Sequence, residues 1–294
     1  MNGQGSTRTR ADSDSQTVGG GPRDLEVLGS IAWAGVLSTD QVQRLHFPSR
    51  RTAQRRLRAL LDRGYVRAHL QSDALHFANV YTATALGLER VAETGAYPDG
   101  IPSVLSLPRR GKLPHALAVR DVFVAFVSAE REGRIRLLDF RFDSDLAREP
   151  EVRDAGVVPD ALASVAGTIA EESLCVEVDR GSETTTTLRA KLQRWADALT
   201  SGRGLFGSAG LLLFVVQRQG RCSTLDRLVA DAGLGERCRV LLQDELPSFL
   251  LGRYPRGGYA APVRAARTSA PAESQAFRPV GELAATAFRP LGRG

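Results

Sequence analysis

Apolar side chains in the first part of the chain recur three or four residues apart, the spacing of amphipathic helices. Three helices are predicted, over about residues 24–35, 38–45 and 48–64. Ser38 and Gln41 give the second helix a capping-box pattern at its start, and Gly64 suits the end of the third. The apolar positions of the third helix are spaced i, i+4, i+7 and i+8, which predicts one buried face.

The pattern then changes from helical to extended. Residues 65–70 and 79–82 are predicted to be two strands around the polar turn 71–73, and residues 83–94 a closing helix. Three helices followed by a hairpin are typical of a winged helix-turn-helix unit, which we place at residues 23–95. Such a unit binds DNA or serves only in dimerisation or protein docking.

A linker is predicted at residues 96–113, which hold three prolines and the basic residues Arg109, Arg110 and Lys112. The second unit, residues 114–254, has the order helix, three strands, helix, strand, which predicts an α/β core. Its strands are expected at about residues 135–142, 157–165, 174–179, 211–217 and 240–243, and its helices from Pro114 onward, at 187–199 and at 225–232. The predicted fold class of the chain is therefore α+β.

Both ends of the chain are predicted to be disordered tails. Residues 1–22 are rich in Gly, Ser, Thr and Asp, and residues 255–294 in Ala, Pro, Gly and Arg, so neither can bury much apolar surface. The second tail repeats the tripeptide Phe-Arg-Pro at Phe277 and Phe288. We expect that both tails can be removed without unfolding the core.

Charge is divided unevenly along the 294 residues, although the formal net charge is +6. Residues 23–95 carry ten basic and seven acidic groups (+3), residues 114–250 carry seventeen and twenty-one (−4), and residues 255–294 carry six and two (+4). A uniformly basic surface is thereby excluded, and any nucleic-acid contact must come from particular segments.

The cysteines and the apolar segments indicate in which cellular compartment the protein is expected. The three cysteines are odd in number and have no Cys-x-x-Cys spacing, which argues against a disulfide framework and against a structural zinc site. The longest apolar run, 211–216, is too short to span a bilayer, and the N-terminus has no hydrophobic signal core. A cytoplasmic protein that makes no membrane contact is predicted.

The third helix presents a basic face about 120° from its apolar stripe, formed by Arg51, Gln54, Arg55 and Arg58. Arginine pairs with guanine and glutamine with adenine in the major groove, so this face predicts binding to double-stranded DNA. Contact of Arg50, Arg51 and Arg67 with phosphates is an alternative role for these residues. The alternative is a solvated face in an arginine-rich protein.

A second candidate site lies around the strand that ends at Asp179. Strand alternation places Glu177 and Asp179 on one face, and Asp160 follows another apolar segment. Only two of the 39 basic residues are lysines, and one of them, Lys191, lies on the flank of the next helix. Asp160 and Glu177 would bind Mg²⁺, Asp179 would be a third ligand or orient water, and Lys191 would neutralise a scissile phosphate. The alternative is that these residues form surface ion pairs and that Lys191 lies along Trp195.

Together these features resemble the bacterial replication-relaxation family, named for plasmid replication and plasmid DNA relaxation. The resemblance covers about residues 24–250 and rests on the N-terminal unit, Pro159-Asp160, Glu177-Val178-Asp179-Arg180-Gly181-Ser182-Glu183, Lys191 and Trp195. It implies a second domain similar to the restriction-endonuclease-like PD-(D/E)xK fold, with Asp160 as the motif aspartate and Glu177 as the motif acid. Asp179 stands where the motif lysine is expected, and Lys191 could be a migrated replacement.

The sequence and the family resemblance leave three alternative functions. The first is a DNA-binding protein acting in the replication or maintenance of a plasmid or other mobile element, as a homodimer or with a replication or mobilisation partner. The second is a Mg²⁺-dependent nicking endonuclease using Asp160, Glu177, Asp179 and Lys191. The third is a transcriptional repressor or partner-docking protein whose nuclease-like domain is catalytically silent.

Overall fold

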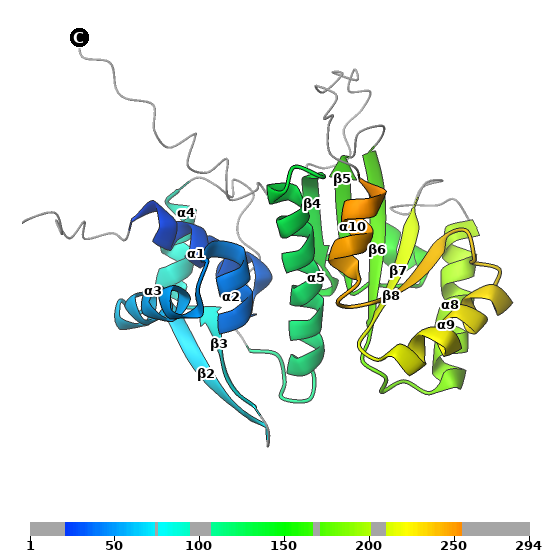
Figure 1. Cartoon of the computed structure of the whole chain (residues 1–294), viewed down its shortest axis with the longest axis horizontal. Helices are drawn as coiled ribbons and strands as arrows, with labels where there is room; N and C mark the ends of the chain where they lie inside the picture. The colour runs from blue at the N-terminus through cyan, green and yellow to red at the C-terminus, as the bar shows by residue number, and fades with distance from the viewer. Residues whose placement is uncertain (1–20, 74–75, 95–106, 167–170, 201–209, 255–294) are drawn as a thin grey trace, which may run out of the picture.

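The computed structural model describes residues 21–73, 76–94, 107–166, 171–200 and 210–254, and they form two units packed side by side (Figure 1). The tails predicted at residues 1–22 and 255–294 lie outside the described residues, except that Pro22 already begins the first helix. Among the described residues, no helix has the length and hydrophobicity needed to cross a membrane.

The N-terminal unit contains the three helices, the hairpin and the closing helix predicted from the periodicity. Its elements are α1 (Pro22–Ala34), β1 (Leu37–Ser38), α2 (Thr39–His46), α3 (Arg50–Asp62), β2 (Val66–Asp73), β3 (His76–Ala83) and α4 (Ala85–Ala92). Strand β1 was not predicted, because two residues are too short to show alternation. It pairs antiparallel with β3, which gives the sheet order β1-β3-β2. The prediction of a turn at residues 71–73 is wrong, because these residues belong to β2 and pair with β3.

Local sequence accounts for the helix boundaries of this unit. The capping box at α2 is present: the Gln41 backbone N–H donates to Ser38 Oγ at 3.2 Å, and the Ser38 N–H donates to Gln41 Oε1 at 2.9 Å. Gly64, with φ of 73°, follows α3 in the left-handed region that glycine adopts at low cost. One face of α3 is buried through Ala53, Leu57 and Leu60, as its spacing predicted.

The second unit confirms the predicted order of helix, three strands, helix and strand. Its elements are α5 (Leu113–Arg131), β4 (Arg136–Phe142), α6 (Asp143–Leu146), α7 (Pro150–Ala155), β5 (Ala161–Ala166), β6 (Glu171–Asp179), α8 (Thr185–Thr200), β7 (Leu211–Val216), α9 (Gln219–Asp231), β8 (Cys238–Leu242) and α10 (Leu246–Arg253). The strand predicted at 157–165 begins only at Ala161. Val157 is buried while Val158 is 42% exposed, so this apolar pair leads into the strand without pairing in it.

The sheet of this unit is mixed, with strand order β4-β5-β6-β7-β8. Strands β4, β5 and β6 are antiparallel, whereas β6, β7 and β8 are parallel. Along β6, Leu174, Val176 and Val178 share a core with α5 and α10. Cys175 faces the opposite core, formed with α8 and α9. The sheet is therefore covered on both faces.

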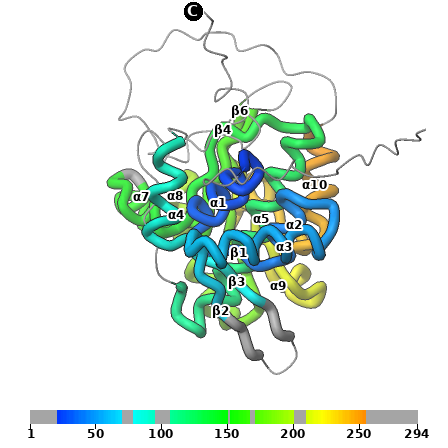
Figure 2. The backbone as a smooth tube through the Cα atoms, turned by 90° about the vertical axis from the view of Figure 1, so that its left-hand side faces the viewer, coloured from blue at the N-terminus to red at the C-terminus, as the bar shows by residue number. Residues whose placement is uncertain are grey.

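The two units share one hydrophobic core that spans the junction between them. The larger cluster runs without interruption from Val27 of α1 to Tyr254 beyond α10. Arg120 of α5 crosses the junction: its Nε donates to the Ala34 carbonyl at 2.9 Å, and its guanidinium lies 4.0 Å from the ring centre of Phe142. Seen from the N-terminal unit, α2 and α3 lie in front of α5 (Figure 2). The relative placement of the two units is thus set by packing.

Gly87 lets α4 lie close to the backbone at Tyr65. A Cβ at this position would lie 2.1 Å from the Tyr65 carbonyl oxygen, which belongs to the backbone. We expect Gly87→Ala to lower the free energy of unfolding by about 1–3 kcal/mol, because the helix must move away from that carbonyl. Denaturant unfolding measures the change.

Gly220→Ala provides the control for this prediction. A Cβ on Gly220 meets nothing within 4 Å, and the residue lies in the first turn of α9. Its substitution should leave stability unchanged or raise it by up to about 1 kcal/mol, because alanine favours helices. Equal effects at the two positions would contradict the close approach of α4 to Tyr65.

Candidate functional site

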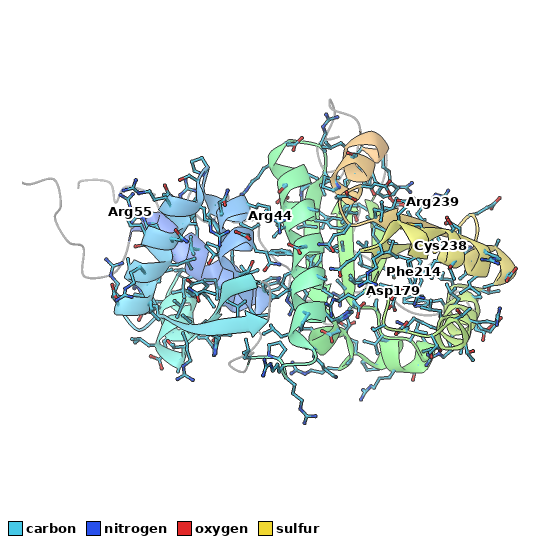
Figure 3. All side chains as sticks on the ribbon, turned by 60° about the horizontal axis from the view of Figure 1, so that its bottom comes forward. Arg44, Arg55, Asp179, Phe214, Cys238 and Arg239 are labelled. Carbon is cyan, nitrogen blue, oxygen red and sulfur yellow. The ribbon has the colours of Figure 1, made fainter. Side chains whose placement is uncertain are left out.

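Two buried carboxylates lie at the carboxyl end of β6, on the face that packs against α8 and α9. Glu177 and Asp179 are each 4% exposed, and the core residue Cys175 precedes them on the same face. The predicted alternation is therefore confirmed. Figure 3 shows Asp179 within the second unit, close to Phe214 of the neighbouring strand β7.

Glu177 accepts hydrogen bonds from two residues of α8. Trp195 Nε1 donates to Oε1 at 3.0 Å, and Lys191 Nζ donates to Oε2 at 3.2 Å. Lys191 also forms an ion pair with Glu183 Oε1 at 3.0 Å. The helical period thus turns Lys191 toward the strand, as the sequence predicted, and Trp195 adds a second donor that the prediction lacked.

Burial and charge shift the pKa values of this pair. Burial and, to a smaller extent, the neighbouring Asp160 carboxylate raise the pKa of Glu177 to about 7 against the opposing effect of Lys191. Burial lowers the pKa of Lys191, but the carboxylates of Glu177 and Glu183 outweigh it and the pKa rises to about 12. Lys191 therefore stays protonated while Glu177 can bind a proton near neutrality.

Asp160 lies immediately before β5 and joins this strand end to α5. Its Oδ2 accepts the Val178 backbone N–H at 2.7 Å, and its Oδ1 lies 2.9 Å from His115 Nε2. The hydrogen bond to Asp160 raises the pKa of His115. No motif in the sequence marks His115 as a partner of Asp160. His115 lies in the first turn of α5, and it also orients Asp160.

Asp179 is held by a different set of donors. Arg221 of α9 forms an ion pair with its Oδ2, and the Gly181 backbone N–H donates to its Oδ1 at 2.8 Å. The Arg221 guanidinium also donates to the Glu183 carbonyl at 2.6 Å. Arg221 was missed by sequence reasoning, because it lies 42 positions after Asp179 with no motif to connect them.

These contacts do not form the predicted magnesium site of Asp160, Glu177 and Asp179. Every oxygen of the three carboxylates already accepts a hydrogen bond from a protein group. Within the described part of the chain, no three His, Cys, Asp or Glu side chains are grouped so that they could hold a metal ion. Asp179 pairs with Arg221 instead of joining the others, which separates the set. The protein's own cations and N–H groups offset the carboxylate charges.

A second candidate site is the outer face of α3. Arg51, Gln54 and Arg55 are exposed and form no ion pair or side-chain hydrogen bond with another described residue. Figure 3 places Arg55 at the outer edge of the N-terminal unit, across α5 from Asp179. Three cationic or polar groups are thus presented together to solvent.

The other residues predicted to contact DNA differ in whether they already form ion pairs. Arg50 forms an ion pair with Asp40, and Arg58, whose side chain is 74% exposed, forms one with Asp62 at 2.9 Å. Exposed pairs of this kind contribute little to stability and can be exchanged for phosphates. Arg67 is exposed on β2, with no ion pair to any other described residue.

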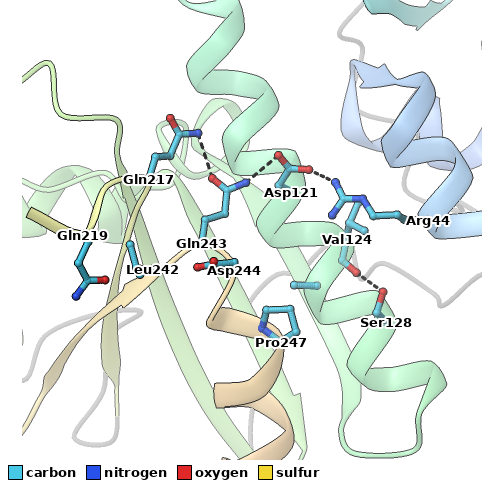
Figure 4. A pocket seen from close by; sticks show the side chains of 11 residues that line it. Arg44, Asp121, Val124, Ser128, Gln217, Gln219, Leu242, Gln243, Asp244 and Pro247 are labelled. Atoms are coloured by element: carbon cyan, nitrogen blue, oxygen red, sulfur yellow. Dashed lines mark hydrogen bonds and ion pairs between the residues drawn. The ribbon is translucent and has the colours of Figure 1, made fainter. Parts of the chain in front are cut away.

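A groove of about 880 Å³ lies between the two units (Figure 4). Arg44 of α2 forms an ion pair with Asp121 of α5 at one side of it. Asp121 Oδ2 accepts from Gln243 at 2.9 Å, and the Gln243 carbonyl oxygen accepts from Gln217 at 3.1 Å. This chain of contacts links the N-terminal unit to the carboxyl ends of β7 and β8. The groove is therefore part of the junction between the two units.

The described residues form an α+β protein with two buried carboxylates at the carboxyl end of β6. The chain belongs to the replication-relaxation family, which matches it over residues 28–206, more than half of its length. The family resemblance inferred from the sequence is thereby confirmed. Curated proteins gave no match.

Among solved structures, the restriction endonuclease FokI is similar at low identity. The TM-score is 0.32 and the sequence identity 12%, over 77% of this chain and 42% of the FokI chain. The chain thus spans less than half of the FokI chain that it matches, and no activity is transferred from that enzyme.

The Lys191–Glu177 contact predicts a pH-dependent stability. Folding raises the pKa of Glu177 from 4.5 to about 7, so the neutral carboxyl favours the fold below this range and that advantage is lost as pH rises through it. At about pH 8 the buried carboxylate is ionised, and we expect Lys191→Met to cost about 1–3 kcal/mol of unfolding free energy. At about pH 5.5 the cost should be smaller.

A double-mutant cycle isolates this contact. Glu177→Gln removes the charge but keeps a hydrogen-bond acceptor for Trp195, so Lys191→Met should cost much less in that background. Denaturant unfolding of the four proteins at both pH values gives the coupling energy. A coupling energy near zero at about pH 8 would contradict a stabilising role of Lys191 toward Glu177.

Proposed function

We propose that the protein binds duplex DNA through its N-terminal unit, which acts as a winged helix with α3 in the major groove. The observation that supports this proposal is the exposed row of Arg51, Gln54 and Arg55 without partners among the described residues. Arginines on the other side of this helix and at its C-cap are used internally, since Arg56 and Arg63 both pair with the buried Asp24. The chain thus separates structural arginines from those available to a ligand.

The family supplies the biological setting of this proposal. A replication-relaxation protein that binds duplex DNA would act in the cytoplasm, in the replication or maintenance of a plasmid or other mobile element. In that setting α3 supplies base contacts through its arginine and glutamine side chains, while Arg50 and Arg67 contact the backbone on either side.

Replacing Arg51, Gln54, Arg55 and Arg58 together with alanine should abolish sequence-selective binding. Each lost base contact is expected to cost about 1–3 kcal/mol. The probe is a duplex selected by the parent protein from a random-sequence pool, titrated by mobility shift at constant salt. A scrambled duplex of the same length measures non-specific binding.

The control removes the same number of cations from the second unit. Arg136, Arg153 and Arg227 are exposed there and pair with no described residue, so their triple alanine variant should keep selectivity for the chosen duplex. If the α3 variant binds that duplex as tightly as the parent, α3 is not the reading element.

The contact of Lys191 with Glu177 favours one second candidate, a Mg²⁺-dependent nicking endonuclease, because it brings a cation to the expected motif acid. Against this candidate, Asp179 is bound by Arg221 and every site carboxylate already has protein donors. We therefore expect supercoiled plasmid to stay supercoiled with the protein and Mg²⁺. Nicked plasmid that chelator or Glu177→Gln prevents would establish the endonuclease and refute a silent domain.

A further inference from the structure

A basic turn immediately precedes α5 and belongs to neither candidate site. Arg109, Arg110 and Lys112 are all exposed in it, within four consecutive positions. The Lys112 backbone N–H donates to the Arg109 carbonyl at 2.7 Å, which closes the turn and fixes its backbone. The sequence suggested only a linker here, but the turn has a defined conformation that leads directly into a helix of 19 residues.

Apolar anchors attach this turn to the hairpin of the N-terminal unit. Leu113 is fully buried against Val36 and Val80, and Leu107 packs on the same small cluster from the other side of the turn. Val80 lies on β3, which pairs along its whole length with β2. The basic turn is therefore held beside the hairpin. In Figures 1 and 2 the hairpin and the start of α5 both lie at the lower edge of the molecule.

The same turn also borders the carboxylate site of the second unit. Lys112 is the N-cap of α5, and His115, three residues later, contacts Asp160 at 2.9 Å. The chain has only two lysines, and Lys191 is the one beside Glu177. Lys191 of α8 therefore contacts the carboxylate site directly, whereas Lys112 lies one helical turn before His115 in the chain.

The position of this turn relative to α3 is fixed by the junction. Gln41 of α2 donates to the Leu117 carbonyl of α5 at 2.8 Å, and Arg131 at the other end of α5 donates to the Leu45 carbonyl. The distance and orientation between α3 and the start of α5 are consequently fixed for any ligand that α3 binds.

We propose that Arg109 and Lys112 bind the phosphodiester backbone of the duplex that α3 reads, on the side of the hairpin away from α3. This inference rests on the proposed function. Neither side chain forms an ion pair within the described residues, and both are exposed at the start of α5. Cations on a fixed turn neutralise phosphates without a large ordering cost, and they bind any sequence alike.

The experiment measures how DNA affinity depends on salt. Each phosphate contact contributes about 0.9 to the slope of log K against log salt concentration, so Arg109→Ala with Lys112→Ala should reduce the slope by about 1.8. Affinity should fall for selected and scrambled duplexes alike, and selectivity between them should remain. Hydroxyl-radical footprinting should show protection lost at one end of the footprint only.

Arg153→Ala with Arg227→Ala is the matched control, because it removes two exposed cations from other surfaces of the second unit. It should leave the slope and the footprint unchanged. The proposed phosphate contact of Arg109 and Lys112 would be overturned if their variant kept the salt slope of the parent, or if its slope fell no more than that of the control. That result leaves the proposed function standing if the α3 variant still loses selectivity, whereas the proposed function itself fails if the α3 variant binds like the parent.

Discussion

Helix α5 is buried on two sides, and the positions of both candidate sites depend on this double packing. Toward the sheet, Phe123 packs edge-on against Phe140 of β4, with ring centres 5.1 Å apart. Toward the N-terminal unit, Arg120 donates to the Ala34 carbonyl from a largely buried position. A buried guanidinium is costly unless its donors are satisfied, so this contact is tolerated only with the two units docked. The helix is therefore a common frame for both units.

Helix α5 also contributes to a polar network, because His115 in its first turn contacts Asp160. Asp160 and Glu177 lie close enough at the carboxyl end of β6 to raise each other's energy when both are ionised, and Asp179 is buried on the same strand. The chain offsets them with separate donors: His115 and the Val178 N–H for Asp160, Lys191 and Trp195 for Glu177, Arg221 for Asp179. Removing one partner from such a set leaves an uncompensated buried charge, which costs more than the pair contributes. The arrangement favours a fixed structure over an open metal site.

Periodicity predicted what depends on neighbouring positions in the chain. The face of α3, the shared orientation of Glu177 and Asp179, and the approach of Lys191 to Glu177 all follow from repeats of 3.6 and 2 residues. Contacts between distant segments left no such signal. His115 and Asp160 lie 45 positions apart, and the shared core across the two units depends on how α5 docks. The start of strand β5 was predicted too early, at residue 157, because an apolar pair before a strand has the same sequence pattern as the strand itself.

The continuous core also decides how two DNA contacts would combine. Contacts on two domains joined by a flexible linker are related by an effective concentration, which falls as the linker lengthens. Here Leu113 and Gln41 fix the start of α5 to the N-terminal unit, so a contact at Arg109 and Lys112 needs no further ordering of the domains. Its contribution would then depend on whether the duplex follows the surface from α3 past the hairpin. A duplex that must bend to do so would bind according to its flexibility, and the basic turn would add an indirect sequence preference to the direct one of α3.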